Sequence, residues 1–456
     1  MPRVVVVSPP FASHATPLSV LATALAAEGA DVFFACAPEF AGLARGDGVA
    51  FVPLTVTRNA NTGVAEATRQ PAEEAARLGE FLEATRAGAV PTLLTQARHR
   101  RADMLADPEG VLSALRGLHE RLRPHWYVTD QLGFAVTLAL HCMGVPYATF
   151  CPGHPGYLPA DSDAYFGVPY DWPASLRPSP ADAGLLLAAA RRNDTAFTEA
   201  FQDFARRHAP SAPAPGRAFA LCSPHAVVHA YPEFSWLPAP PPGPVRLFAD
   251  HLAAPPAPLD AAWSARLDAL RRHARRIVLV AFGTFLSARD DVLRAVAEGV
   301  LGGMPDTAVI VAAGERAGAL ADLAGDRAVV VPSVPQQALL EHVDMMVHHG
   351  GGNSFTECLR AGVPALVLPF SSDQFAVARD AECSGTGVVA DPNALPASAV
   401  PALLEALSGD ARDHTAWFAA RLRTRGPRWA AGELLRVMGE RTGPAGRRGR
   451  ASLPAE

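Results

Sequence analysis

The chain alternates short β-branched runs with helical segments from its first residues onward. Residues 3–8 have the composition of a strand, residues 17–28 place leucines on one helical face, and residues 31–35 again resemble a strand. Thr16 followed by proline is a helix-start signal, which supports the expected helix at 17–28. Strand–helix–strand units of this kind build parallel sheets.

The same alternation continues through both halves of the chain. Residues 125–130 and 146–150 are strand-like and flank an apolar helix that starts near Phe134. Later strand-like runs fall at residues 276–282, 308–312, 328–331, 345–348 and 365–369. Helical segments separate these runs, which is the doubly wound pattern. We therefore expect an α/β protein with two Rossmann-like domains that face each other across a cleft.

The length and the prolines suggest where the domains divide. A chain of 456 residues is too long for one compact core. Residues 237–259 are dense in proline, a composition that suits a semi-rigid linker. We expect an N-terminal domain over 1–236, a linker over 237–259, a C-terminal domain over 260–436 and a flexible tail over 437–456.

Composition excludes several classes of partner. Hydrophobic residues make up 49% and charged residues 19%, as in a globular protein, and a net charge of -5 without a basic patch argues against nucleic-acid binding. The six cysteines are widely spaced, which favours a reducing compartment. No apolar stretch is long enough for membrane insertion and the N-terminal apolar run is too short for a signal peptide, so we expect a cytoplasmic protein. A homodimer is a hypothesis that the sequence leaves open.

Residues 345–357 carry the most informative pattern, Met-Met-Val-His-His-Gly-Gly-Gly-Asn-Ser-Phe-Thr-Glu. An apolar strand ends in glycines and a polar helix start, where free backbone N–H groups and the helix dipole attract a diphosphate. Asn353 and Ser354 can add donors, and Glu357, one helical turn on, can accept hydrogen bonds from ribose hydroxyls. The alternative is that Ser354 and Glu357 form a capping box and His349 is an ordinary loop residue.

This segment resembles the signature of nucleotide-sugar-dependent glycosyltransferases of family 1, which have two Rossmann-like domains in the GT-B arrangement and include antibiotic-modifying and macrolide enzymes. The motifs of that signature occur here in order as His349-Gly-Gly-Gly-Asn-Ser354, Glu357, Gly362-Val-Pro364 and Asp373-Gln374, preceded by Phe282-Gly-Thr284 and Pro335-Gln336.

The resemblance implies a set of donor-binding residues. It assigns the diphosphate to His349, Gly352, Asn353, Ser354 and Thr284, the ribose to Glu357, the base to Val334 and Gln336, and the sugar hydroxyls to Asp373 and Gln374. Plant members usually carry Trp where this chain has Ser333, so the choice between UDP and dTDP stays open. The alternative for Asp373 and Gln374 is a polar turn after a buried strand.

His14 and Asp130 are the candidate catalytic pair. His14 precedes the first expected helix and Asp130 ends the strand at 125–130, and both positions lie at the crevice edge of a parallel sheet. Histidine can take a proton from an acceptor hydroxyl, and a carboxylate can orient the ring and stabilise its charged form. The resemblance supports both roles. The alternatives are that His14 caps the first helix and that Asp130 is the N-cap of the helix near Phe134.

We expect direct displacement with inversion at the anomeric carbon, no bound metal, and no cofactor besides the nucleoside-diphosphate sugar as co-substrate. Two alternatives remain: a nucleotide-sugar epimerase or hydrolase of the same fold, and an inactive auxiliary subunit of a glycosyltransferase.

The acceptor is expected to be a small natural product bound by variable loops at 56–71 and 152–173. The Ala, Arg and Pro bias resembles that of antibiotic-producing bacteria and favours a secondary metabolite. Aromatic side chains in the second loop suggest a partly apolar acceptor surface, with simple packing as the alternative; they are Tyr157, Tyr165, Phe166, Tyr170 and Trp172.

Overall fold

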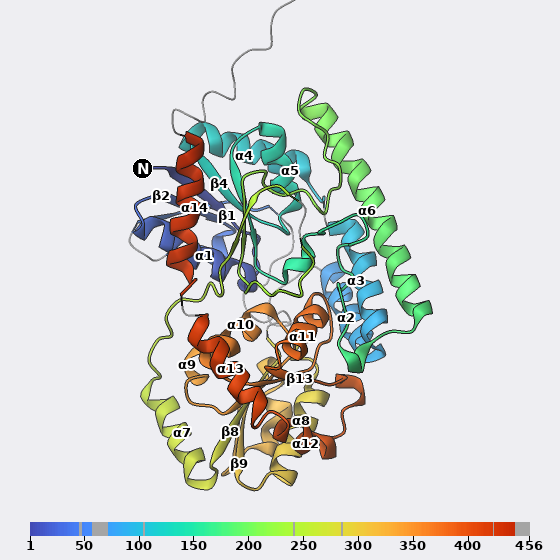
Figure 1. The fold of residues 1–456 in the computed structure, drawn as a ribbon, viewed down its shortest axis with the longest axis vertical. Coiled ribbons are helices and arrows are strands. Elements are labelled where there is room, and N and C mark those ends of the chain that lie inside the picture. The colour runs from blue at the N-terminus through green and yellow to red at the C-terminus, as the bar shows by residue number, and fades with distance from the viewer. Residues whose placement is uncertain are drawn as a thin grey trace, which may run out of the picture.

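A computed structural model describes residues 1–44, 48–56, 72–103, 105–239, 242–283, 286–422 and 424–442. The chain forms two α/β lobes, one above the other in Figure 1. Thr284, most of the expected acceptor loop at 56–71 and residues 443–456 of the expected tail lie outside the described residues.

The N-terminal lobe contains a parallel sheet with the strand order β3-β2-β1-β4-β5-β6-β7. Its strands are β1 (Arg3–Val7), β2 (Asp31–Cys36), β3 (Val49–Pro53), β4 (Trp126–Asp130), β5 (Tyr147–Cys151), β6 (Ala226–His229) and β7 (Val245–Phe248). The carboxyl ends of β1, β4 and β5 lie side by side, since Val7 pairs with Thr129 and Asp130 with Phe150. The loops that follow these strands therefore meet at one edge.

Helices cover both faces of this sheet. One face packs against α1 (Ala12–Ala27) and α14 (Pro427–Thr442), and the other against α4 (Pro108–Leu122) and α5 (Phe134–Met143). The helices α2 (Ala72–Ala87), α3 (Ala89–Asp103) and α6 (Pro180–His208) stand together at the side of the molecule and reach toward the lower lobe (Figure 1). The leucines predicted to share a face of the first helix are buried in this core.

The C-terminal lobe contains a second parallel sheet with the order β10-β9-β8-β11-β12-β13. Its strands are β8 (Arg276–Ala281), β9 (Thr307–Ala312), β10 (Ala328–Val331), β11 (Met345–His348), β12 (Ala365–Val367) and β13 (Gly387–Val389). One face packs against α8 (Asp290–Gly303) and α12 (Val400–Glu405). The other packs against α7 (Ala261–His273), α9 (Gln336–Leu339), α10 (Gly352–Ala361) and α11 (Gln374–Cys383), with α13 (Asp410–Arg421) beside α10.

The predicted fold class is confirmed, because each lobe is a parallel sheet between helices. Every strand expected from the sequence is present with ends within two residues of the expectation. The expected linker at 237–259 is different, since β7 lies inside it and pairs with β6. β7 is an edge strand, and the nearby prolines are tolerated there because an edge leaves one side of the backbone unpaired.

The chain also returns to the N-terminal lobe at its end. The sequence placed residues up to 436 in the C-terminal domain and a tail from 437, but α14 runs to Thr442 beside α1 (Figure 1, red beside blue). Val437 and Met438 are 4% and 1% exposed against the first sheet. Burial of this apolar face stabilises a helix that the sequence alone suggested was frayed.

The helix α1 begins at Ala12, five residues before the expected start at Pro17, which lies inside it. Proline has no N–H and usually breaks a helix interior. Here the first turn forms because the N–H groups of His14 and Ala15 donate to the carbonyl of Phe11, at 2.9 and 2.8 Å. His14 therefore lies on the first turn of a helix.

Within the described ranges, no helix is both long and apolar enough to cross a membrane.

Candidate active site

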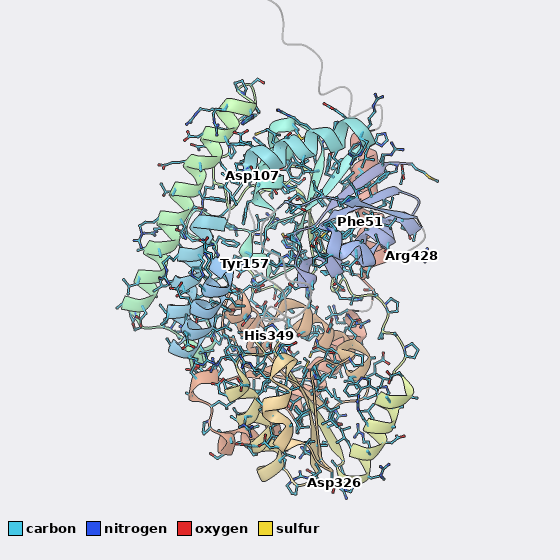
Figure 2. All side chains as sticks on the ribbon, turned by 180° about the vertical axis from the view of Figure 1, so that it is seen from behind. Phe51, Asp107, Tyr157, Asp326, His349 and Arg428 are labelled. Carbon is cyan, nitrogen blue, oxygen red and sulfur yellow. The ribbon has the colours of Figure 1, made fainter. Side chains whose placement is uncertain are left out.

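A cavity of about 790 Å³ lies between the two lobes, where the carboxyl ends of both sheets face each other. Of the candidate residues, His14, Gln336, His349, Gly352, Asn353, Ser354, Asp373 and Gln374 line it. Tyr157 from the upper lobe and His349 from the lower lobe both lie near the middle of the molecule in Figure 2. Asp130, Val334 and Glu357 are not part of the lining and stand behind it.

The structure pairs His14 with Asp130. The Nδ1 atom of His14 lies 3.0 Å from Oδ2 of Asp130, whose side chain is fully buried, while the His14 side chain is 18% exposed. The other carboxylate oxygen of Asp130 accepts a hydrogen bond from the backbone N–H of Leu132 at 2.8 Å. The helix α5 is capped by Gly133 without a side-chain bond, so Asp130 is not its N-cap. The carboxylate holds the imidazole with Nε2 directed away from it.

Three effects set the pKa of His14. Burial alone would lower this pKa, but the charge of Asp130, its hydrogen bond to the ring, and the charge of Asp373 together outweigh burial and raise the pKa above 6.5. Asp373 belongs to the opposite lobe, so its charge acts on His14 across the cavity. The ring can therefore accept a proton readily and hold it as a stabilised cation.

The glycine-rich loop follows β11 and leads into α10. Gly350 has a φ of 82°, a left-handed conformation that favours glycine, and its N–H donates to Nδ1 of His348 at 3.0 Å. Gly351 is the N-cap of α10 and provides no side chain, so the first N–H groups of the helix receive no side-chain cap. Ser354 is not the N-cap, and the expected alternative of a capping box is therefore wrong. The helix start is available to an anion.

His349 is held between two glycines at the base of the cavity. Gly283 has a φ of 70°, and a Cβ atom there would lie 2.8 Å from Cε1 of His349. A Cβ atom at Gly351 would lie 2.6 Å from Nε2 of the same ring. Burial lowers the pKa of His349 to about 4, so the ring is neutral at neutral pH. Its Nδ1 atom is buried, and an interaction with the backbone of Ala281 opposes the effect of burial on the pKa.

The start of α10 also contacts the N-terminal lobe. The side-chain amide of Asn353 donates to the carbonyl of Ser13 at 3.2 Å. A Cβ atom at Gly352 would lie 3.6 Å from the carbonyl oxygen of Pro152, so the loop after β5 passes directly over the helix start. The start of α10 and the helical turn that carries His14 are thus neighbours.

Glu357, the predicted ribose residue, and Gln336, a predicted base residue, belong to one hydrogen-bonded group. Glu357 accepts from Nε2 of Gln336 at 2.7 Å and from Nε2 of Gln337 at 2.9 Å, and Ser354 Oγ lies 3.2 Å from the same Gln336 atom. Burial raises the pKa of Glu357, an effect that these two amides oppose. Val334 packs against the apolar core of the lobe, just before Gln336. In this structure both carboxylate oxygens of Glu357 therefore accept hydrogen bonds from glutamine side chains.

The loop after β12 places Asp373 and Gln374 at the start of α11. Gln374 turns back, because its Oε1 accepts from the backbone N–H groups of Phe370 and Ser371 at 2.9 and 3.0 Å. Asp373 Oδ2 accepts from the backbone N–H of His154 at 2.8 Å. Ser372, with a φ of 56°, exchanges two hydrogen bonds with the amide of Gln96 on α3. The sequence did not indicate Gln96, since a glutamine in an amphipathic helix carries no distinguishing signal.

A buried carboxylate that the sequence analysis did not single out joins the lobes behind the cavity. Asp380 on α11 is 0% exposed, and among the described residues the donors to its carboxylate all come from the N-terminal part of the chain. The donors are His154 Nε2 at 3.0 Å, Tyr170 OH at 2.6 Å, Tyr231 OH at 2.8 Å and Trp236 Nε1 at 2.8 Å. This group fixes the loop at 152–173 against the helix that carries Asp373. We call these five residues the Asp380 cluster.

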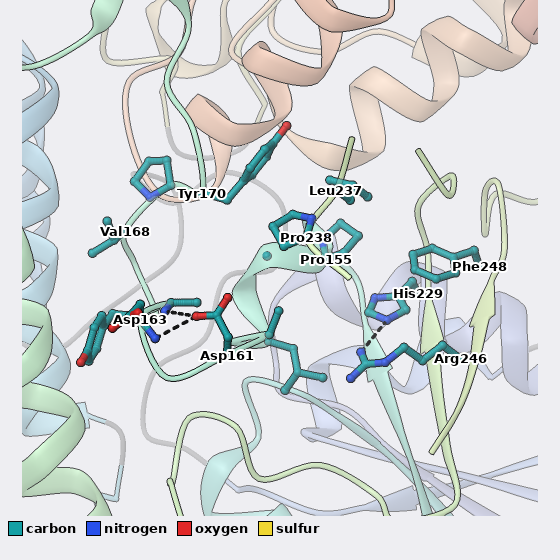
Figure 3. Close-up of a pocket in the computed structure, with 16 residues that line it drawn as sticks. Pro155, Asp161, Asp163, Val168, Tyr170, His229, Leu237, Pro238, Arg246 and Phe248 are labelled. Carbon is teal, nitrogen blue, oxygen red and sulfur yellow. Dashed lines mark hydrogen bonds between the residues drawn. The ribbon is translucent and has the colours of Figure 1, made fainter. Parts of the chain in front are cut away.

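The aromatic residues of the loop at 152–173 divide between two spaces. Tyr157 and Phe166 line the large cavity, with ring centroids 4.8 Å apart. Tyr165 and Tyr170 line a separate pocket of about 260 Å³ on the other side of the loop, where Arg246 lies beside His229 (Figure 3). Trp172 packs on Phe375 at 5.2 Å. Two of these aromatics thus line the cavity, as an apolar acceptor surface would require, and packing or the small pocket accounts for the others.

Comparison with known protein families matches part of the C-terminal lobe. Residues 300–425 match the family of the erythromycin biosynthesis protein CIII-like C-terminal domain. A sterol 3-beta-glucosyltransferase of Aspergillus fumigatus is 32% identical over 131 residues, which cover 26% of this chain and 9% of that protein. The chain thus spans only a small part of this curated relative. These matches confirm the resemblance that the motifs predicted.

Solved structures match almost the entire chain. The kitacinnamycin glycotransferase has a TM-score of 0.65 with 22% identity over 96% of this chain and 100% of that one. The spinosyn rhamnosyltransferase SpnG complexed with thymidine diphosphate has a TM-score of 0.58 with 19% identity over 95% of this chain and 100% of that one. These similarities establish the two-lobed GT-B fold.

Proposed function

We propose that this protein transfers a hexose-type sugar from a UDP- or dTDP-sugar to a hydroxyl of a small natural-product acceptor, with inversion of the anomeric configuration. The observation that carries the proposal is the His14–Asp130 pair, 3.0 Å apart, on the same cavity as the uncapped start of α10. A base and an anion site that share one cavity are what a displacement of diphosphate by a hydroxyl requires.

In the first step His14 removes the proton of the acceptor hydroxyl as its oxygen attacks the anomeric carbon. Asp130 orients the ring through Nδ1 and stabilises the imidazolium that forms. The negative charge of Asp373 across the cavity acts in the same direction. After transfer the proton leaves His14 to solvent, since the side chain is 18% exposed.

The leaving diphosphate is stabilised by the start of α10. The first backbone N–H groups of that helix and its dipole favour negative charge. We assign further hydrogen bonds to Ser354, to the amide of Asn353 and to His349, which is neutral and can donate from a ring nitrogen. The N–H groups replace a metal ion in this scheme. Among the described residues, no group of three His, Cys, Asp or Glu side chains is placed to hold a metal ion.

We assign the nucleoside to Glu357, Gln336 and Val334. The carboxylate of Glu357 accepts from two glutamine amides, and ribose hydroxyls would replace or join these donors. We assign the binding of the sugar hydroxyls to Asp373 and the start of α11. Gln374 acts mainly by holding the loop around Asp373 in place. The names of the matched proteins, which include a sterol glucosyltransferase and glycosyltransferases of antibiotics, support an apolar natural-product acceptor.

Nucleotide binding tests the donor half of the proposal. Isothermal titration of UDP and of dTDP should show micromolar binding of at least one of them to the wild type. Glu357→Ala should weaken that binding about tenfold or more, because the ribose hydroxyls lose a buried acceptor. The absence of binding by both nucleotides would overturn the proposal and favour an inactive auxiliary subunit.

Turnover tests the base. His14→Ala should keep nucleotide binding but lose sugar transfer by about 100-fold or more, whereas His273→Ala, an exposed histidine at the end of α7, should leave both unchanged. A His14→Ala variant that still consumes the sugar nucleotide at the wild-type rate would favour an epimerase or hydrolase. Measurement of the anomeric proton coupling in the product decides the stereochemistry, and retention would contradict the mechanism.

A further inference from the structure

Arg100 on α3 is a cation in the acceptor half of the large cavity. Its guanidinium carbon lies 4.6 Å from the ring centroid of Phe166, on the loop at 152–173. Gly167, with a φ of 82°, leaves the space that the guanidinium occupies, because a Cβ atom there would overlap Nη1 of Arg100. The arginine is thus seated between α3 and the acceptor loop.

The position of Arg100 is fixed by its neighbours on α3. Gln96, one helical turn earlier on the same face, exchanges two hydrogen bonds with Ser372, at 2.7 and 3.0 Å. This contact pins α3 to the loop that carries Asp373. The guanidinium is therefore held at the junction of the two lobes, where an acceptor and a donor sugar would meet.

Of the other basic side chains that line the cavity, all except the neutral His349 have acidic partners. Arg77 pairs with Glu73 at 2.9 Å, His99 with Glu80 at 2.6 Å, and His14 with Asp130 at 3.0 Å. For Arg100, no hydrogen bond or ion pair is found with any residue in the described ranges of the chain. The charge of Asp373 opposes the effect of burial on the pKa of Arg100, and it acts from beyond ion-pair distance.

An unpaired guanidinium in a partly buried position is unusual. Burial lowers the pKa of Arg100, but an arginine stays charged in proteins at neutral pH. Removing such a charge from water without a partner is unfavourable, and Arg presents a planar fork of N–H donors that matches a carboxylate. Because no residue in the described ranges accepts a hydrogen bond from these donors, a carboxylate on a ligand is a matching partner for them.

We propose that Arg100 is an acceptor-recognition residue that binds a carboxylate carried by the acceptor. This inference rests on the proposed function and specifies its substrate class as acidic, partly aromatic acceptors. Arg100, Phe166 and Tyr157 all belong to the N-terminal lobe, opposite the nucleotide-binding lobe. The donor sugar is assigned to Asp373 on the lower lobe, so Arg100 on α3 faces the acceptor side of the cavity.

The test compares paired ligands that differ only in this charge. We would titrate a panel of phenolic acids and their methyl esters, beginning with 4-hydroxycinnamate, into the wild type in the presence of saturating UDP or dTDP at pH 7.5. The acid should bind at least about tenfold more tightly than its ester, because the ester cannot form the charge-assisted pair. Binding is read directly, so the result does not depend on turnover.

Variants then assign the preference to Arg100. Arg100→Gln should abolish the preference for the acid, Arg100→Lys should keep part of it, and Arg98→Gln, on the exposed side of the same helix, should keep all of it. Thermal melting verifies that each variant is folded, and nucleotide binding verifies that the donor site is intact. An acid preference that survives in Arg100→Gln, or a panel in which no acid binds better than its ester, overturns the proposal.

A separate arm tests the donor. UDP-glucuronate and UDP-glucose are compared for binding to the wild type and to Arg100→Gln. If Arg100 governs a preference for the glucuronate while the acids show none, the anion belongs to the donor and the assignment to the acceptor is wrong. Loss of all nucleotide binding in the wild type contradicts the proposed function itself, and the two failures are therefore distinguishable.

Discussion

The side-chain amide of Asn353 donates a hydrogen bond of 3.2 Å to the backbone carbonyl of Ser13, across the cleft between the lobes. In a regular helix that carbonyl would accept from the N–H of the residue four positions later, which here is Pro17 and has no N–H. The proline inside α1 therefore leaves an acceptor for the glycine-rich loop. The contact places the start of α10 next to His14.

Replacement of Asn353 by aspartate tests this contact. The substitution keeps the shape but removes the N–H donor, so a carboxylate oxygen would face the carbonyl of Ser13 and the diphosphate. We expect Asn353→Asp to bind the nucleotide about 30-fold or more weakly, and Asn353→Ala to lose less, because alanine brings no repulsion. Isothermal titration measures both. Equal losses in the two variants would show that repulsion plays no part.

The pH dependence of transfer should follow His14. Its pKa is raised above 6.5 by Asp130 and Asp373 despite burial, and the protonated ring cannot act as a base, so kcat/KM should fall as the pH drops through this raised value. Asp130→Asn removes the charge that stabilises the imidazolium. The acidic limb should then move to lower pH while the plateau rate falls about 10-fold to 10⁴-fold. If the acidic limb of the kcat/KM profile stays at the same pH in Asp130→Asn, the limb reports the titration of another group than His14.

Gly283→Ala should disturb His349. The φ of 70° at this position is strained for alanine, and the new Cβ atom would lie 2.8 Å from the ring. We expect a loss of about 1–3 kcal/mol of stability from the backbone strain, with weaker nucleotide binding. Gly302→Ala on α8 is the matched control, since nothing lies within 4 Å of its added methyl group and alanine favours a helix. Denaturant melts and titration with nucleotide provide the two readouts.

The Asp380 cluster should stabilise the arrangement of the two lobes. Asp380→Asn replaces one acceptor oxygen by an N–H₂ group that must face existing donors, so we expect a loss of about 2–4 kcal/mol in the free energy of unfolding. Tyr231→Phe removes a single donor and should cost about 1–2 kcal/mol. Asp326→Asn, on an exposed loop of the lower lobe, should be neutral. The acceptor KM of Asp380→Asn should also rise, because the loop at 152–173 loses its attachment to α11.

Local patterns were sufficient to predict the fold class, the central strands of both sheets and the candidate residues of the donor site, but β3, β6, β7 and β13 were not predicted. Buried parallel strands are β-branched runs, and a glycine-rich turn between a strand and a helix can be recognised from its own sequence. The pairing of His14 and Asp130 also followed from the rule that the carboxyl ends of parallel strands meet at one edge. The hydrogen bonds of Gln374 to its own loop were not predicted, since a side-chain amide can bond a ligand or the nearby backbone equally well.

Contacts between residues far apart in the chain could not be predicted from the sequence. α14 looked like the end of the second domain and a tail, and only the face of α1 on the other lobe explains its burial. Asp380, Gln96 and Arg100 lie in helices whose patterns show no more than amphipathicity, and their partners are hundreds of residues away or, for Arg100, absent from the described chain. The sequence by itself determined the α/β class, the central strands of the two sheets and the polar residues at their edges, because those depend on local periodicity. Only the tertiary structure decided how the lobes join and which charges the cavity leaves unpaired, because hydrogen bonds and burial across an interface depend on distances that no local pattern encodes.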